Sequence, residues 1–136
     1  MKLINPSVEL ITQTPDLEGI YKQVERVGRV CYKSEDKITE DSAKPFVERM
    51  VKSGHNAMLE HGTVYLAAPY NNEDLLFWKV ANSPYSKGVC DDKSNLLCLT
   101  TNLRVIAELN AWEVIDKYLC EPTETHVKRI CLKFIT

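Results

Sequence analysis

Several residue patterns that mark common protein classes are missing from this chain of 136 residues. The five cysteines are odd in number, scattered, and never form a C-x-x-C pair, which argues against a disulfide framework and against a cysteine zinc site. No apolar run is long enough to span a bilayer, and no signal peptide is recognisable. These absences predict a cytoplasmic protein with reduced thiols and no membrane partner.

Strong charge and internal repetition are missing as well. The formal net charge of −2 provides no general attraction for nucleic acid, so no nucleic-acid partner is expected. No repeat, low-complexity segment or clear linker divides the sequence. With 44% hydrophobic and 26% charged residues, the composition is that of an ordinary globular domain. The length is enough for one hydrophobic core, so we expect a single domain over residues 1–136.

Helical periodicity is clearest in the first half of the chain. Apolar residues at helical spacing predict a helix that begins after Asp16, as its N-cap, and ends near residue 31. A second helix is expected to begin at Thr39 or Asp41, with Pro45 in its first turns. Further helical segments are predicted after a cap at Asn102, over residues 112–119, and within residues 71–80.

Alternating apolar and polar residues predict strands over residues 7–12, 63–68 and 130–135, and a hairpin around residues 89–99. In this interpretation His126 begins the last strand and lies at the surface. Helices and strands in this order predict an α+β fold, with helices packed on a small antiparallel or mixed sheet.

The stretch from Lys52 to Leu66 concentrates the polar chemistry. It holds two of the three histidines, His55 and His61, and Glu60 precedes the second. Gly54 stands where a helix C-cap is expected, and the predicted strand follows directly. The cluster therefore falls in a tight passage from helix to strand, a common location for functional residues.

Two motifs carry a resemblance to a known family. The pattern G-H-x4-E-H-G at residues 54–62, before a strand, resembles the N-terminal half of the flavin-dependent thymidylate synthases. The run V-G-R-V-C-Y at residues 27–32 is similar to the A-R-x-S/C-F/Y segment that ends the first long helix of that family, in the same order and at similar spacing. Residues 31–40 and the run L-C-E-P-T-E at 119–124 resemble the phage and gut-bacterial branch.

The resemblance implies a function and a set of partners. The family converts dUMP to dTMP by reductive methylation, with methylenetetrahydrofolate, NADPH and bound FAD, and forms homo-oligomers (a dimer or tetramer here) whose active sites lie between subunits. Its R-H-R motif would follow the strand at 130–135 and is absent from this sequence. We therefore expect that the chain lacks the family's C-terminal half and has no thymidylate synthase activity alone. The alternative is a non-catalytic shortened relative that acts as a dimeric binding or assembly module.

The resemblance assigns His55 to a contact with the flavin ring. The alternative is a histidine that caps the preceding helix, where the helix dipole favours it. Ala57 stands where the family usually has Ser or Thr, and Asn56 is the candidate that replaces the lost hydrogen bond. No catalytic residue is assigned.

Four further residues are candidates for cofactor binding, each with a structural alternative. Glu60 could fix the tautomer of His61, or could bond backbone amides at the turn, and the spacing does not fit a metal site. Cys31 could donate to a flavin phosphate, or be a small buried residue at a helix end. Arg29 could bind a phosphate or carboxylate, or form a surface ion pair with Glu25.

Overall fold

The computed structural model describes residues 3–126, and this part of the chain has the predicted α+β fold. The helices are α1 (Leu17–Cys31), α2 (Ala43–Ser53), α3 (Leu75–Ala81), α4 (Leu103–Glu108) and α5 (Trp112–Tyr118). Two short 3-10 helices are η1 (Glu35–Lys37) and η2 (Asn56–His61). The strands are β1 (Thr63–Pro69), β2 (Lys87–Asp91) and β3 (Leu96–Asn102).

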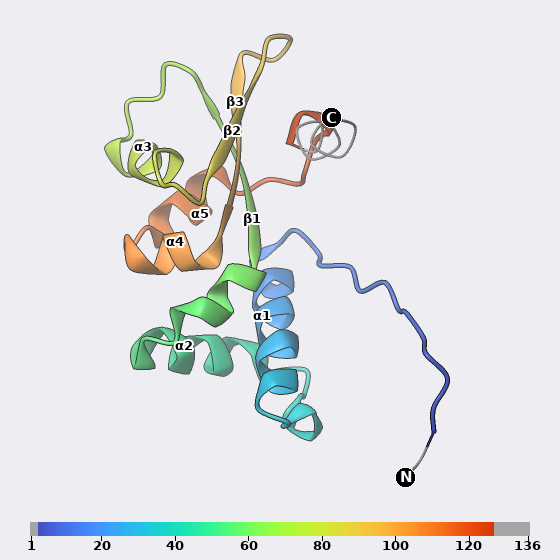
Figure 1. Cartoon of the computed structure of the whole chain (residues 1–136). Helices are drawn as coiled ribbons and strands as arrows, with labels where there is room; N and C mark the ends of the chain where they lie inside the picture. The colour runs from blue at the N-terminus through green and yellow to red at the C-terminus, as the bar shows by residue number, and fades with distance from the viewer. Residues whose placement is uncertain (1–2, 127–136) are drawn as a thin grey trace.

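The strands form an antiparallel sheet in the order β1-β3-β2. The pairing of Leu66 with Leu99 and of Ala67 with Cys98 sets which side chains share a face. Helices α3, α4 and α5 gather on one side of the sheet, and α1 and α2 lie beyond one end of β1 (Figure 1). Leu66, Leu99 and Phe77 are completely buried, so the main core lies between the sheet and its helices.

Side-chain caps begin three of the helices. The carboxylate of Asp16 accepts from the backbone N–H of Gly19 at 3.2 Å, and Asn102 accepts from the N–H of Val105 at 3.1 Å. Both caps were predicted from the sequence and are confirmed. Asp74 caps α3 in the same way by accepting from Leu76.

The predicted start of the second helix is wrong by a few residues, because α2 begins at Ala43. The residues before it form a local turn instead, in which the N–H of Thr39 donates to Ser42 Oγ at 2.8 Å. Hydroxyl side chains compete with the helix for backbone groups in this way. The turn therefore delays the helix beyond both predicted caps.

The predicted strand over residues 7–12 is also wrong. The segment is extended but belongs to no sheet, and Val8 and Leu10 are 100% and 88% exposed. The outer edge of β1 is already bonded: Thr63 exchanges two hydrogen bonds with the side chain of Gln13, and the N–H of Cys120 donates to Tyr65 O at 3.0 Å. Figure 1 shows the N-terminal segment leaving the body of the molecule at this edge. Alternating apolar and polar residues favour an extended backbone, but a β-strand also needs a neighbouring strand whose backbone groups are free to pair with it.

His126 does not begin a strand and does not lie at the surface. It is in a helical turn at residues 124–126 and is only 3% exposed. Its Nδ1 accepts from the N–H of Thr123 at 3.1 Å, its Nε2 lies 3.0 Å from Leu66 O, and its ring meets Tyr65 edge-on. The imidazole thus ties the segment after α5 to β1. The strand predicted at 130–135 lies outside the described residues.

Candidate functional site

The end of α2 fixes the start of the polar cluster. Gly54 has a left-handed backbone with φ of 74°, which a glycine adopts without steric cost. The N–H groups of Gly54 and His55 donate to the carbonyls of Val51 and Met50, at 3.2 and 3.0 Å. The last turn of the helix is therefore closed by backbone bonds, and the side chain of His55 remains available at the surface.

The two segments that carry the family resemblance meet through their side chains. The hydroxyl of Tyr32, just after α1, lies 3.2 Å from Nδ1 of His55. Either group can donate, depending on the imidazole tautomer. Both side chains are exposed, and Tyr32 keeps 50% of its surface. The pair therefore presents two ring systems to solvent from elements 23 residues apart.

The Tyr32–His55 pair forms a wall shared by two surface pockets. The Arg104 pocket, of about 490 Å³, is completed by Gly54, Asn56, Ala57, Met58, Arg104 and Glu108. The Arg49 pocket, of about 520 Å³, is completed by Arg49, Met50, Lys52 and Ser53. A ligand held against the shared wall could therefore extend into both pockets.

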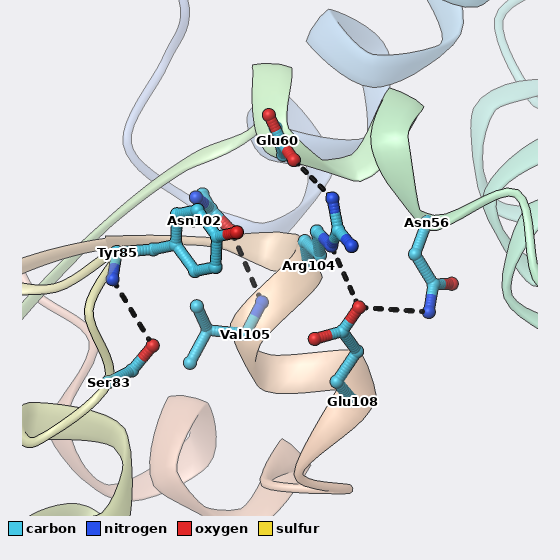
Figure 2. Close-up of polar contacts among 8 residues, drawn as sticks. All are labelled: Asn56, Glu60, Ser83, Tyr85, Asn102, Arg104, Val105 and Glu108. Carbon is cyan, nitrogen blue, oxygen red and sulfur yellow. Dashed lines mark hydrogen bonds and ion pairs between the residues drawn. The ribbon is translucent and has the colours of Figure 1, made fainter.

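Arg104 links the 3-10 helix η2 to α4. Its guanidinium donates to Glu108 Oε1 at 2.7 Å and also to Glu60, and Asn56 Nδ2 lies 3.5 Å from the same Glu108 oxygen (Figure 2). The Asn102 cap begins α4 and so sets the direction of Arg104, whose guanidinium also lies 5.8 Å from the centre of the Tyr85 ring. The network holds the loop after His55 against α4.

This network also sets the charge of the Arg104 pocket. The hydrogen bond from Arg104 lowers the pKa of Glu108, and the bonds to Glu108 and Glu60 raise the pKa of Arg104. Glu108 and Arg104 are therefore charged at neutral pH, and the carboxylate groups of Glu108 and Glu60 both face one guanidinium. Arg104 is thus not free to neutralise an anionic ligand.

Arg29 is not part of either pocket. The predicted ion pair with Glu25 is present at 3.2 Å, but the prediction of a surface pair is wrong, since the two side chains are 10% and 2% exposed. Ser42 donates to the other oxygen of Glu25, and the Phe46 ring lies 4.7 Å from the Arg29 guanidinium. Packing of α2 on α1 therefore converts a surface pair into a buried one.

The other candidates separate in the structure. Cys31 is exposed and lines neither pocket, so the alternative of a small buried residue is wrong. Glu60 pairs with Arg104 and not with His61 or with the turn amides. His61 is exposed, and its imidazole has no hydrogen bond within residues 3–126. His55 and Asn56 are the predicted residues that reach a common pocket.

Sequence reasoning missed Arg104 and Glu108. Their spacing of four residues on a predicted helix is a readable signal for an ion pair. The bond from Arg104 to Glu60 joins positions 44 residues apart, and no local pattern indicates it.

Neither a metal-binding cluster nor a membrane-spanning helix is found in residues 3–126. No group of His, Cys, Asp and Glu side chains is arranged to hold a metal ion, and no helix is long and apolar enough to cross a membrane. Comparison with protein-family models, curated proteins and solved structures finds no match for this chain.

Proposed function

We propose that this chain supplies part of an FAD site in a protein related to the flavin-dependent thymidylate synthases. The supporting observation is the contact of Tyr32 with His55, 3.2 Å between the hydroxyl and Nδ1. It brings together the two motifs that resemble the family and makes them the common wall of two pockets. The complete reaction would be the reductive methylation of dUMP to dTMP, with methylenetetrahydrofolate and NADPH.

The residues at the shared wall fit a flavin ring chemically. A phenol and an imidazole offer flat surfaces for stacking, and polar tips for the ring edge. Asn56 is held by Glu108, and it adds an amide beside His55. When bound, FAD supplies the redox chemistry, while the protein residues orient the ring and exclude alternative positions.

The thymidylate reaction needs more phosphate-binding groups than the Arg104 pocket offers. The R-H-R motif is absent from the sequence, and Arg104 is engaged by two carboxylates. Nucleotide phosphates need several cationic or amide donors. We expect the 136-residue chain alone to form no dTMP, and measurable dTMP formation by the purified chain would contradict this part of the proposal.

Titration of the purified protein with FAD, followed by flavin fluorescence, tests the site. Saturable quenching is expected for the native chain and should be lost in His55→Ala. His61→Ala is the matched control, because His61 is exposed, lies six residues away and lines neither pocket. Equal quenching in all three proteins would overturn the assignment to His55.

A second candidate function is a non-catalytic dimeric binding or assembly module. The exposed N-terminal segment favours it: Leu3, Ile4, Val8 and Leu10 are more than four-fifths exposed, although apolar side chains gain free energy by burial. Sedimentation velocity tests this candidate. A dimer that dissociates when residues 1–12 are removed would support it, and a monomer at all concentrations would exclude it.

A further inference from the structure

The Arg49 pocket differs in charge from the Arg104 pocket. Its lining contains two cations, Arg49 and Lys52, and no carboxylate. Neither cation has an ion pair within 4.0 Å among residues 3–126. The lining of the Arg104 pocket includes the carboxylate of Glu108, which already bonds Arg104. Uncompensated positive charge is therefore concentrated on one side of the Tyr32–His55 wall.

The fold keeps both cations on the same side of α2. Arg49 and Lys52 are three residues apart, and residues at this spacing are neighbours on a helix surface. The guanidinium of Arg49 lies 5.9 Å from the centre of the Phe46 ring, which supports it from the buried side. Glu48 is four residues before Lys52 but does not approach it within 4.0 Å. Helix α2 therefore places the two positive charges side by side, and its Glu48 carboxylate does not neutralise that of Lys52.

Neutral polar groups complete the pocket. The Tyr32 hydroxyl and the His55 imidazole stand at the shared wall, whereas Ser53 Oγ donates its proton to Met50 O at 3.3 Å and so does not donate to a ligand in this arrangement. The end of a helix is ordinarily unfavourable for anions. Here the terminal carbonyls of Met50 and Val51 accept from backbone N–H groups, and the two cations outweigh the remaining partial charge.

We propose that the Arg49 pocket binds the phosphate groups of a phosphorylated ligand whose flat ring lies against Tyr32 and His55. Phosphate carries several strong acceptors and pairs well with guanidinium and ammonium groups. The inference shares the Tyr32–His55 wall with the proposed flavin site, and it rests on that proposal for the identity of the ring. For FAD, the pyrophosphate would occupy this pocket, and the ring edge would face Asn56.

Comparison of FAD, riboflavin and ADP separates the two proposals. Isothermal titration with the native chain and with the double variant R49Q/K52Q gives the dissociation constants. We expect the double variant to bind FAD and ADP about tenfold more weakly, and to bind riboflavin as the native chain does. Added salt should reduce the preference for FAD over riboflavin, because exposed charges are screened. Lys79→Gln, which removes one exposed charge from α3, is the control and should change nothing.

Three outcomes of these titrations distinguish the phosphate site from the flavin site. If riboflavin and FAD bind equally and R49Q/K52Q has no effect, the phosphate site is wrong while the flavin site stands. If ADP binds through Arg49 and Lys52 but riboflavin does not bind, the phosphate site stands and the flavin proposal is wrong. If none of the three ligands binds to a protein that circular dichroism shows to be folded, both proposals are overturned.

Discussion

Single residues fix the backbone around the candidate site. Gly54 closes α2 in a left-handed conformation and passes the chain to His55. His126 uses both ring nitrogens to hold the segment after α5 on β1. Neither residue is proposed to contact a ligand, but each fixes the position of the adjoining backbone.

Gly54→Ala should lower the free energy of unfolding by about 1 kcal/mol, because a left-handed backbone is unfavourable for residues with a Cβ. A Cβ at this position would meet no atom of another segment within 4 Å, so the cost arises from the local backbone conformation and not from a clash with a neighbouring element. Urea denaturation measures it. Gly54→Asn is the control and should cost less than Gly54→Ala, since asparagine tolerates this conformation. Equal loss in both variants would contradict the explanation.

His126→Ala should lower the free energy of unfolding by about 2–4 kcal/mol, because it leaves a cavity and removes the hydrogen bonds of a buried imidazole to the N–H of Thr123 and the carbonyl of Leu66. His61→Ala is the matched control, since His61 is exposed, and should change stability by less than about 0.5 kcal/mol. Similar urea midpoints for the two variants would show that the buried contacts contribute little.

At the scale of helices and strands, close packing places the motifs. Gly28 of α1 lies against the Phe46 ring in the first turns of α2. Beyond the ends of these helices, the Tyr32 hydroxyl lies 3.2 Å from His55 Nδ1. The 3-10 helix η2 then connects to α4 through Glu60 and Arg104. The site is therefore assembled by contacts between α1, α2, η2 and α4.

Gly28→Ala tests the contact of α1 with α2. In an exposed helix this change stabilises by about 1 kcal/mol. Here the new Cβ would lie 2.5 Å from Phe46 Cζ, and overpacking of a buried ring costs about 1–3 kcal/mol. We expect the clash to win, with a net loss of about 1 kcal/mol in thermal or urea unfolding. The double variant Gly28→Ala/Phe46→Leu should lose less free energy of unfolding than the two single variants lose together. A Gly28→Ala variant that is more stable than the native chain would contradict a tight contact between Gly28 and Phe46.

The link between η2 and α4 should depend on pH. Because Arg104 lowers the pKa of Glu108 in the folded state, this pair stabilises the fold above the ordinary value of 4.5, and the contribution is lost as pH falls through the lowered pKa. Because Glu108 is exposed, the free energy of unfolding of the native chain should be higher than that of Glu108→Gln by less than about 1 kcal/mol at pH 7. The difference should approach zero once the pH lies below the lowered pKa of Glu108. A difference that grows in acid would contradict this sign.

At the scale of the whole molecule, the sequence predicted the features that depend on neighbouring residues better than those that depend on contacts between distant segments. The caps at Asp16 and Asn102 and the α+β class depend on neighbouring residues, and all three are confirmed. The strand at 7–12 failed because the edge of β1 is already bonded elsewhere, which alternation does not indicate.

The candidate site shows the same limit. His55 and Asn56 were predicted together because they are adjacent in one motif, whereas the burial of Arg29 results from α2 packing on α1. The bond from Glu60 to Arg104 joins η2 to a helix far along the chain. Contacts between distant segments decide which charged residues remain free for a ligand, so the sequence motif alone could not show that Arg104 is engaged.

Amide chemical-shift mapping of the labelled chain with FAD tests the proposed flavin site most directly, because it locates the ligand. We expect the largest changes at Tyr32 and over residues 54–58, with smaller changes near Arg49 and Lys52. His55→Ala should remove them at the same FAD concentration, and His61→Ala should not. Changes centred on α3 or β2, or no change at high micromolar FAD, would contradict a flavin site at the Tyr32–His55 wall.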